Sequence, residues 1–123
     1  MAWFALNGKL GWATCPMTQA GFVRVLSNPA FDPAAPPMSR ALELLSASTE
    51  SNPHHQFWSD AIPLSRIGAD LSQRIQGRNQ ITDAYLLALA IHHHGHFVTF
   101  DSRMESLAPK GSSEHKALLI LRP

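Results

Sequence analysis

The sequence predicts an α/β fold in which a mostly parallel sheet lies between two layers of helices. Two observations lead to this prediction. Short β-prone segments alternate along the chain with segments whose apolar residues have helical spacing, as expected when helices connect parallel strands. The 123 residues suit one domain, and they contain no internal repeat and no obvious linker. We therefore expect residues 1–123 to form a single three-layer α/β/α sandwich.

The first elements are delimited by turn residues. A strand is expected at 12–15, closed by Pro16. Thr18 resembles an N-cap, because apolar residues follow it at helical spacing until the Ser-Asn-Pro run at 27–29. Residues 29–37 hold four prolines and predict a loop.

A second helix and a second strand follow this loop. Ser39 is expected to cap the helix, whose apolar residues at 41–45 lie on one side. Residues 46–55 are polar and predict a loop, and residues 56–58 predict a short strand.

The second half of the chain has clearer periodicity. Apolar residues recur every three or four positions over 64–75, which predicts an amphipathic helix ended by Gly77. The segment 81–94 is apolar nearly all round, so its helix should be buried on more than one side, with Gly95 as the left-handed residue after it. Apolar strands are expected at 97–100 and 118–121.

Composition excludes several classes of protein. Apolar residues make up 45% of the chain, and its net charge is +1, so RNA or DNA binding must depend on a local patch. The longest apolar run, 84–91, is far shorter than the ~20 residues of a membrane span. Cys15 is the single cysteine and cannot form an internal disulfide. With no signal-peptide pattern at the N-terminus, we expect a cytoplasmic protein with no membrane partner.

Two acidic residues stand where a functional site would form. Asp83 falls in the first turn of the 81–94 helix, where amides and the helix dipole favour a carboxylate, and the alternative is a simple helix cap. Asp101 ends a buried strand, where ligands gather in open parallel sheets, and the alternative is an N-cap for a helix at 104–108. Mg²⁺ often takes only one or two protein carboxylates, so the pair suits a hard cation.

Five blocks between residues 12 and 101 support a family resemblance that covers almost the whole chain, from Trp3 to about Ile120. They are WATCP at 12–16, GFVRVLSNP at 21–29, FWSD at 57–60, TDAYLLALA at 82–90 and TFD at 99–101. In this order they resemble VapC-type PIN-domain toxins.

The resemblance implies a PIN-like fold and an endoribonuclease that depends on Mg²⁺ or Mn²⁺. About four acidic residues would surround one or two metal ions, and Asp83 and Asp101 match the third and fourth of them, as catalytic and metal-binding residues. The metal would hold the scissile phosphate and activate water. The implied partners are an RNA substrate and a cognate antitoxin protein.

The chain also departs from the family pattern. The N-terminal strand that carries the first catalytic Asp has no counterpart, so the domain is expected to be N-terminally truncated relative to the family. Gln19 stands at the second acidic position, and its carbonyl can bind a metal only weakly because it adds no charge. We therefore expect a degenerate or shortened, weakly active ribonuclease. The alternative is a non-catalytic PIN remnant that binds an antitoxin or RNA.

Several further residues are candidates for RNA contact because of their expected nearness to the acidic pair. They are Arg24, Arg78, Asn79, Gln80 and Thr99. The histidines at 92–94 and 96 are better explained as a solvated helix end than as a zinc site.

The expected loss of a central strand also bears on assembly. The segments 12–15 and 97–100 would become neighbouring unpaired edges, and apolar edges are costly to leave open. The two edges could pair directly or accept a strand from another chain. We expect instead a homodimer whose interface includes these edges or the N-terminal segment with Trp3 and Phe4.

Overall fold

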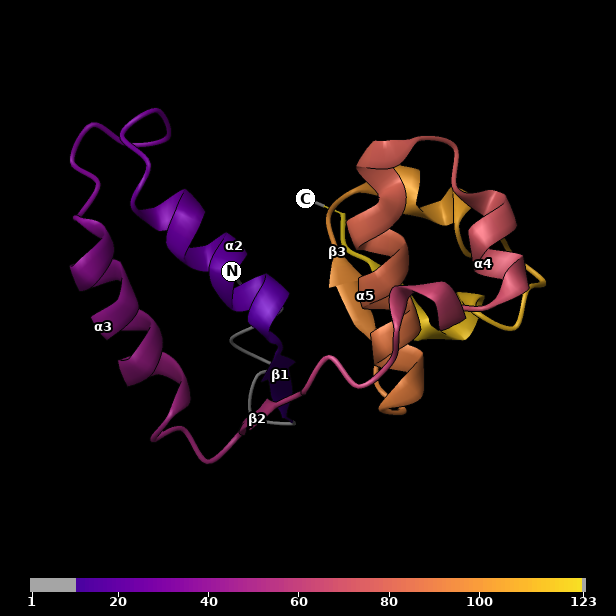
Figure 1. Ribbon diagram of the computed structural model, residues 1–123, viewed down its shortest axis with the longest axis horizontal. Helices are drawn as coiled ribbons and strands as arrows, with labels where there is room; N and C mark the ends of the chain where they lie inside the picture. The colour runs from indigo at the N-terminus through magenta and orange to yellow at the C-terminus, as the bar shows by residue number, and fades with distance from the viewer. Residues whose placement is uncertain (1–10, 123) are drawn as a thin grey trace. The chain divides into compact units, whose positions relative to one another are not determined.

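The computed structural model describes residues 11–122 of the chain. The chain forms two compact units, Met1–Ser59 and Asp60–Pro123, here called the N-terminal unit and the C-terminal unit (Figure 1). Trp3 and Phe4, expected at a dimer interface, lie outside the described residues. Each unit contains one pair of parallel strands together with helices. Parallel strands linked by helices confirm the α/β fold class, whereas the single three-layer domain stays a prediction.

The N-terminal unit pairs its two short strands in parallel. Trp12 lies opposite His55 and Thr14 opposite Phe57, and α2 (Pro16–Leu26) packs against α3 (Met38–Thr49) (Figure 1). Both expected strands are confirmed, each about one residue from its expected position. In chain order the elements are β1 (Trp12–Thr14), α2 (Pro16–Leu26), α3 (Met38–Thr49) and β2 (His55–Phe57).

Helix α2 begins two residues before the expected cap. Pro16 is its first residue and Cys15 its N-cap, because proline has a preset φ and lacks the N–H that a helix start leaves unpaired. The Thr18 hydroxyl lies one turn further on and accepts a hydrogen bond from the Cys15 N–H at 2.9 Å. The assignment of Thr18 as the N-cap was therefore wrong, although its hydroxyl still satisfies the helix start.

Helix α3 differs from its prediction at both ends. It begins at Met38 after Pro37, so Ser39 lies inside the helix instead of capping it. It continues to Thr49, four residues into the expected polar loop, and the Ser48 and Thr49 hydroxyls satisfy their own polar groups by donating to carbonyls one turn earlier.

The C-terminal unit is built around α5 (Ile81–His92) and a second pair of parallel strands. Phe97 lies opposite Leu118 and Thr99 opposite Ile120. Its elements are η2 (Leu64–Arg66), α4 (Ala69–Arg74), η3 (Arg78–Gln80), α5 (Ile81–His92), β3 (Phe97–Thr99), η4 (Ser102–Ser106), η5 (His115–Ala117) and β4 (Leu118–Ile120).

Helix α5 is enclosed on several sides, as its apolar sequence predicts. Leu87 and Ala84 are fully buried, and α5 forms one core with Leu71 of α4 and with Met104 and Leu107. The Tyr85 hydroxyl donates to the Ile62 carbonyl at 2.7 Å, which satisfies the polar end of a buried ring. Among residues 11–122, no helix is long and apolar enough to span a membrane.

Helix α5 ends earlier than expected, and a histidine takes the place expected of glycine. The helix stops at His92, and His94 has the left-handed conformation with φ of 59°. The Gly95 N–H donates to the Ala90 carbonyl at 2.8 Å, and the His94 N–H donates to the Ile91 carbonyl at 3.0 Å. This pair of bonds is a Schellman motif, which needs its left-handed residue one position before Gly95.

The helix expected over 64–75 is interrupted. A 3₁₀ turn is followed by Gly68, whose φ of 105° and ψ of 144° end the first segment, and only Ala69–Arg74 is α-helical. The apolar period continues through the break, so periodicity alone does not reveal it. The conformation of Gly68 is one that residues with a Cβ rarely adopt.

We predict that Gly68→Ala lowers the free energy of unfolding by about 1–3 kcal/mol, the usual cost of forcing a Cβ into this backbone region. No atom would obstruct the new methyl group, so the cost is purely conformational. Gly77→Ala is the matched control, because Gly77 is extended and equally open. Urea unfolding followed by circular dichroism measures both, and equal stabilities of the two variants would contradict the prediction.

Candidate functional site

Asp101 stands at the carboxyl end of β3 and fixes the turn that follows. Its backbone N–H donates to the Thr99 hydroxyl at 3.0 Å, and its carboxylate accepts from the backbone N–H of Arg103 at 3.0 Å. The carboxylate thus caps η4, which begins at Ser102, two residues before the expected helix at 104–108. Asp101 therefore caps a helix, as the alternative interpretation held, and also lies at the strand end where a ligand site was expected.

Asp83 lies in the first turn of α5, as expected. The next two residues, Ala84 and Tyr85, are buried, and the Asp83 carboxylate itself is half-buried. Burial raises the pKa of Asp83, and the negative charge of Asp101 raises it further, whereas the Arg103 charge lowers it. Two carboxylates from segments 18 residues apart in sequence therefore lie within electrostatic reach of each other.

Arg103 forms a two-point ion pair with Asp101. Its Nε donates to Oδ1 and its Nη2 donates to Oδ2, both at 3.0 Å. These bonds hold the pKa of Asp101 below its usual value. The Arg103 side chain remains 86% exposed, so one face of the pair is open to solvent.

Gln80 links η3, which lies directly before α5, to η4, which lies directly after Asp101. Its Nε2 donates to the Ser106 hydroxyl at 3.3 Å, and its Oε1 accepts from the Gln76 N–H at 2.8 Å. Both ends of the Gln80 amide are engaged within the protein, and its expected contact with RNA stays a prediction. This bridge between η3 and η4 was missed from the sequence, because it joins residues 26 positions apart.

The other expected RNA contacts differ in their surroundings. Arg78 and Asn79 are exposed on η3, next to the start of α5, and their side chains have no partner within residues 11–122. The Thr99 hydroxyl is engaged by the backbone of Asp101. Arg24 is exposed in the last turn of α2, in the N-terminal unit.

Gln19 belongs to a short hydrogen-bond chain in the N-terminal unit. Its Nε2 donates to the Thr14 hydroxyl at 3.0 Å, and the same hydroxyl lies 2.7 Å from Nε2 of His55. The carbonyl oxygen of Gln19, the atom that binds metals, has no partner within the described chain. Its proximity to the aspartates stays a prediction.

Within residues 11–122, no group of three or more His, Cys, Asp and Glu side chains is arranged to hold a metal ion. Of the histidines at the end of α5 and just after it, His92, His94 and His96 are exposed. The rings of His92 and His93 lie edge to face, with their centroids 5.1 Å apart. A cation at the acidic pair would therefore depend on Asp83 and Asp101, with water or substrate oxygens as its further ligands.

Comparisons with known proteins agree on one family. A family model described as PIN domain matches residues 3–110. Ribonuclease VapC44 of Mycobacterium tuberculosis (strain H37Rv) is 40% identical over 119 residues, which are 96% of this chain and 82% of the relative. Ribonuclease VapC38 of the same strain is 42% identical over 119 residues, with 97% and 82% covered. Ribonuclease VapC39 is 36% identical over 112 residues, with 91% and 80% covered.

We predict that Asp101→Asn lowers the pKa of Asp83 but leaves it above the usual value, because burial is the larger cause of the shift. A raised folded-state pKa makes stability fall as pH rises from about 3.9 to that pKa, so the variant should show a smaller fall. Carboxyl ¹³C NMR titration measures the pKa. Glu105→Gln, also in η4, is the control and should leave it unchanged. An unchanged pKa in Asp101→Asn would contradict the coupling.

Proposed function

The chain belongs to the PIN-domain family as a VapC-type ribonuclease, and we propose that Asp83 and Asp101 hold the divalent cation on which its RNA cleavage depends. The observation behind the proposal is the placement of Asp101 directly after β3 and of Asp83 in the first turn of α5, which contacts β3. Burial raises the pKa of Asp83, and the Asp101 charge raises it further, in agreement with this placement. Their sequence positions match the third and fourth acids of the family pattern.

The donor atoms suit a hard cation such as Mg²⁺ or Mn²⁺. Carboxylate oxygens are the ligands such ions prefer, and Mg²⁺ commonly uses one or two of them. Burial is the main cause of the raised pKa of Asp83, and a cation would offset the second cause, the negative charge of Asp101. When bound, the ion would supply a polarised phosphate and an activated water.

The protein's own residues would prepare this site. The Thr99 hydroxyl accepts a hydrogen bond from the Asp101 backbone, and Gln80 joins η3 to η4, so the segments beside both aspartates are anchored before any ligand arrives. Anchored ligands improve metal binding and catalysis because less ordering remains to be done. Arg78 and Asn79 are exposed beside α5 and would contact phosphates and sugars of the RNA.

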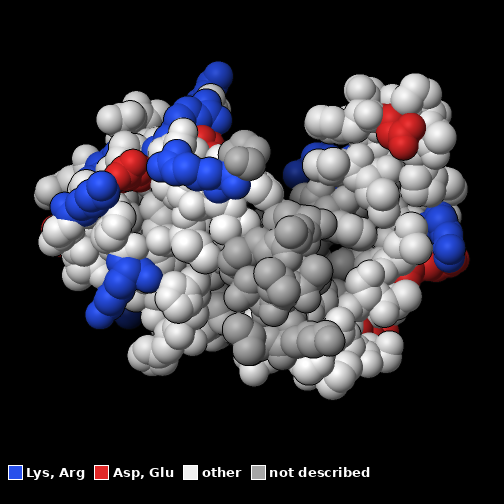
Figure 2. Space-filling model, turned by 180° about the vertical axis from the view of Figure 1, so that it is seen from behind, with Lys and Arg blue, Asp and Glu red and all other residues white. Residues whose placement is uncertain are grey.

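Most of the basic side chains lie in the same part of the chain, together with most of the acidic ones. Seven of the ten Lys and Arg residues and six of the nine Asp and Glu residues fall within 60–123, so this segment has a net charge of +1. In the view of Figure 2, most of the visible Lys and Arg side chains lie over the C-terminal unit. Contacts to the RNA backbone are mostly electrostatic, so local groups of these basic side chains, and not the net charge of the unit, would supply the affinity. Arg24 would add a contact from the N-terminal unit.

Activity is proposed to be weak. Gln19 would be a third ligand through its free carbonyl, and an amide adds no charge to the site and cannot act as a base. A PIN remnant that only binds RNA or an antitoxin is the competing function, because the described residues hold no cluster of three ligating side chains. Metal binding separates the two functions.

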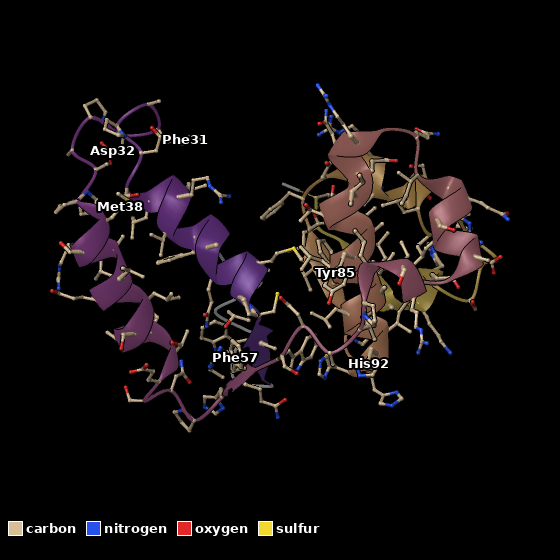
Figure 3. All side chains as sticks on the ribbon, in the orientation of Figure 1. Phe31, Asp32, Met38, Phe57, Tyr85 and His92 are labelled. Carbon is tan, nitrogen blue, oxygen red and sulfur yellow. The ribbon has the colours of Figure 1, made fainter. Side chains whose placement is uncertain are left out.

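A protein partner is part of the proposal. Phe31, in the loop between α2 and α3, and Met38, at the start of α3, are 69% and 68% exposed (Figure 3). Where exposed apolar side chains form a contiguous patch, the surface is typical of one that binds another protein, and we propose that Phe31 and Met38 belong to such a patch. A cognate antitoxin and a second copy of the chain are the proposed partners.

We predict that Asp83→Asn and Asp101→Asn each weaken Mn²⁺ binding at least about ten-fold, because each removes one of two charged ligands. Isothermal titration calorimetry measures this directly. Asp70→Asn is the matched control, because Asp70 is exposed and also lies in the first turn of a helix. Its replacement should leave Mn²⁺ binding unchanged. RNA binding with no Mn²⁺ uptake by the unaltered chain would favour the non-catalytic remnant.

We predict that Gln19→Glu strengthens Mn²⁺ binding only modestly, about three-fold, because one charge is added at the site. Cleavage of RNA should rise with it and stay slow. Gln73→Glu makes the same charge change at an exposed position of α4 and should alter neither quantity. A Gln19→Glu variant that binds Mn²⁺ no better than Gln73→Glu would remove Gln19 from the proposed site.

A further inference from the structure

Resting on the function proposed above, we propose that Arg103 alternates between two anions. It neutralises Asp101 while no cation is bound, and it moves to an RNA phosphate when a cation takes its place. Arg103 would thereby be a substrate-binding residue whose availability depends on the metal. The argument depends on how the Asp101 carboxylate is occupied, on the exposure of Arg103 and on its chemistry.

Most of the acceptor capacity of Asp101 is used within the protein. An ionised carboxylate has about four lone-pair sites. Oδ1 accepts from the backbone N–H and from Nε of Arg103, and Oδ2 accepts from Nη2, all at 3.0 Å. A cation would find one lone pair open, beside a guanidinium of like charge. Cation binding and the Arg103 fork therefore compete for the same two oxygens.

The fork is easily released. Arg103 is 86% exposed, and its guanidinium has no partner in the described chain other than Asp101. Exposed ion pairs are weak because water competes for both partners. The backbone bond from the Arg103 N–H keeps η4 capped when the side chain leaves, so release would not disturb the turn.

A released guanidinium would remain next to the cation, two residues from Asp101. Its planar set of donors matches the oxygens of a phosphate as it matches those of a carboxylate. The RNA phosphate drawn to the cation would therefore meet a second positive group that the cation itself had freed. Metal and RNA binding should consequently reinforce each other.

The first test follows the Arg103 side chain itself. In ¹⁵N–¹H NMR spectra, we expect the Arg103 Nε–H signal of the metal-free protein to be protected by its bond to Asp101. Mg²⁺ should abolish this protection while shifting the signals of Asp83 and Asp101. If those two respond and Arg103 stays protected, the alternation is wrong and the metal site stands. If none responds at millimolar Mg²⁺, the proposed function itself fails.

The second test separates metal from phosphate. Arg103→Gln should bind Mn²⁺ about three- to ten-fold more tightly in calorimetry, because competitor and like charge are both removed. Arg103→Lys keeps the charge without the fork and should fall between Arg103→Gln and the unaltered chain. Arg40→Gln, which breaks the exposed pair with Glu43 in α3, is the control and should change nothing.

RNA binding should change in the opposite direction. A labelled single-stranded DNA offers the same phosphates without being a ribonuclease substrate. In Mg²⁺, Arg103→Gln should bind the labelled DNA more weakly than Arg40→Gln does. The slope of the logarithm of its binding constant against the logarithm of the salt concentration should be smaller in magnitude by about 0.7. In EDTA the two variants should bind equally. Equal binding in Mg²⁺, or a loss of the same size in EDTA, would overturn the alternation.

Discussion

Enclosure of α5 is the constraint on which the rest of the C-terminal unit depends. A helix that is apolar nearly all round cannot leave any long face in water, so α4, η4 and η5 surround it. Its first turn is then held at a fixed place beside the end of β3. The carboxylates of Asp83 and Asp101 are neighbours because a hydrophobic core, and no direct bond between them, brings their segments together.

Local sequence patterns predicted the helices and strands correctly where a single physical effect determined the structure. The apolar composition of α5 and the β-prone segments predicted a buried helix and four short strands, and the alternation predicted parallel pairing. The errors fall where two effects compete. The apolar periodicity continued through Gly68, whose backbone conformation breaks the helix. Gly95 was expected to be the left-handed residue after α5, and that conformation belongs to His94, one residue earlier. How the two units assemble depends on contacts that no short pattern encodes.

The acidic pair could be predicted because each member stands at an element end, where position alone restricts its role. Its surroundings were less accessible. The bond of Gln80 to Ser106 joins distant residues, and nothing local indicates it. The pairing of Asp101 with Arg103 is different, because a capping carboxylate two residues before an arginine is a local arrangement that sequence reasoning could have found.

The hydrogen-bond chain through Thr14 has a consequence for histidine chemistry. The Gln19 amide donates to the Thr14 hydroxyl, which keeps a proton and a lone pair, so either tautomer of His55 satisfies its contact. A carboxylate at position 19 could only accept, so the Thr14 hydroxyl would donate its hydrogen bond to that carboxylate. Nε2 of His55 would then have to carry hydrogen. One amide-for-acid difference in α2 therefore leaves an imidazole in β2, 36 residues away, free to exist in two forms.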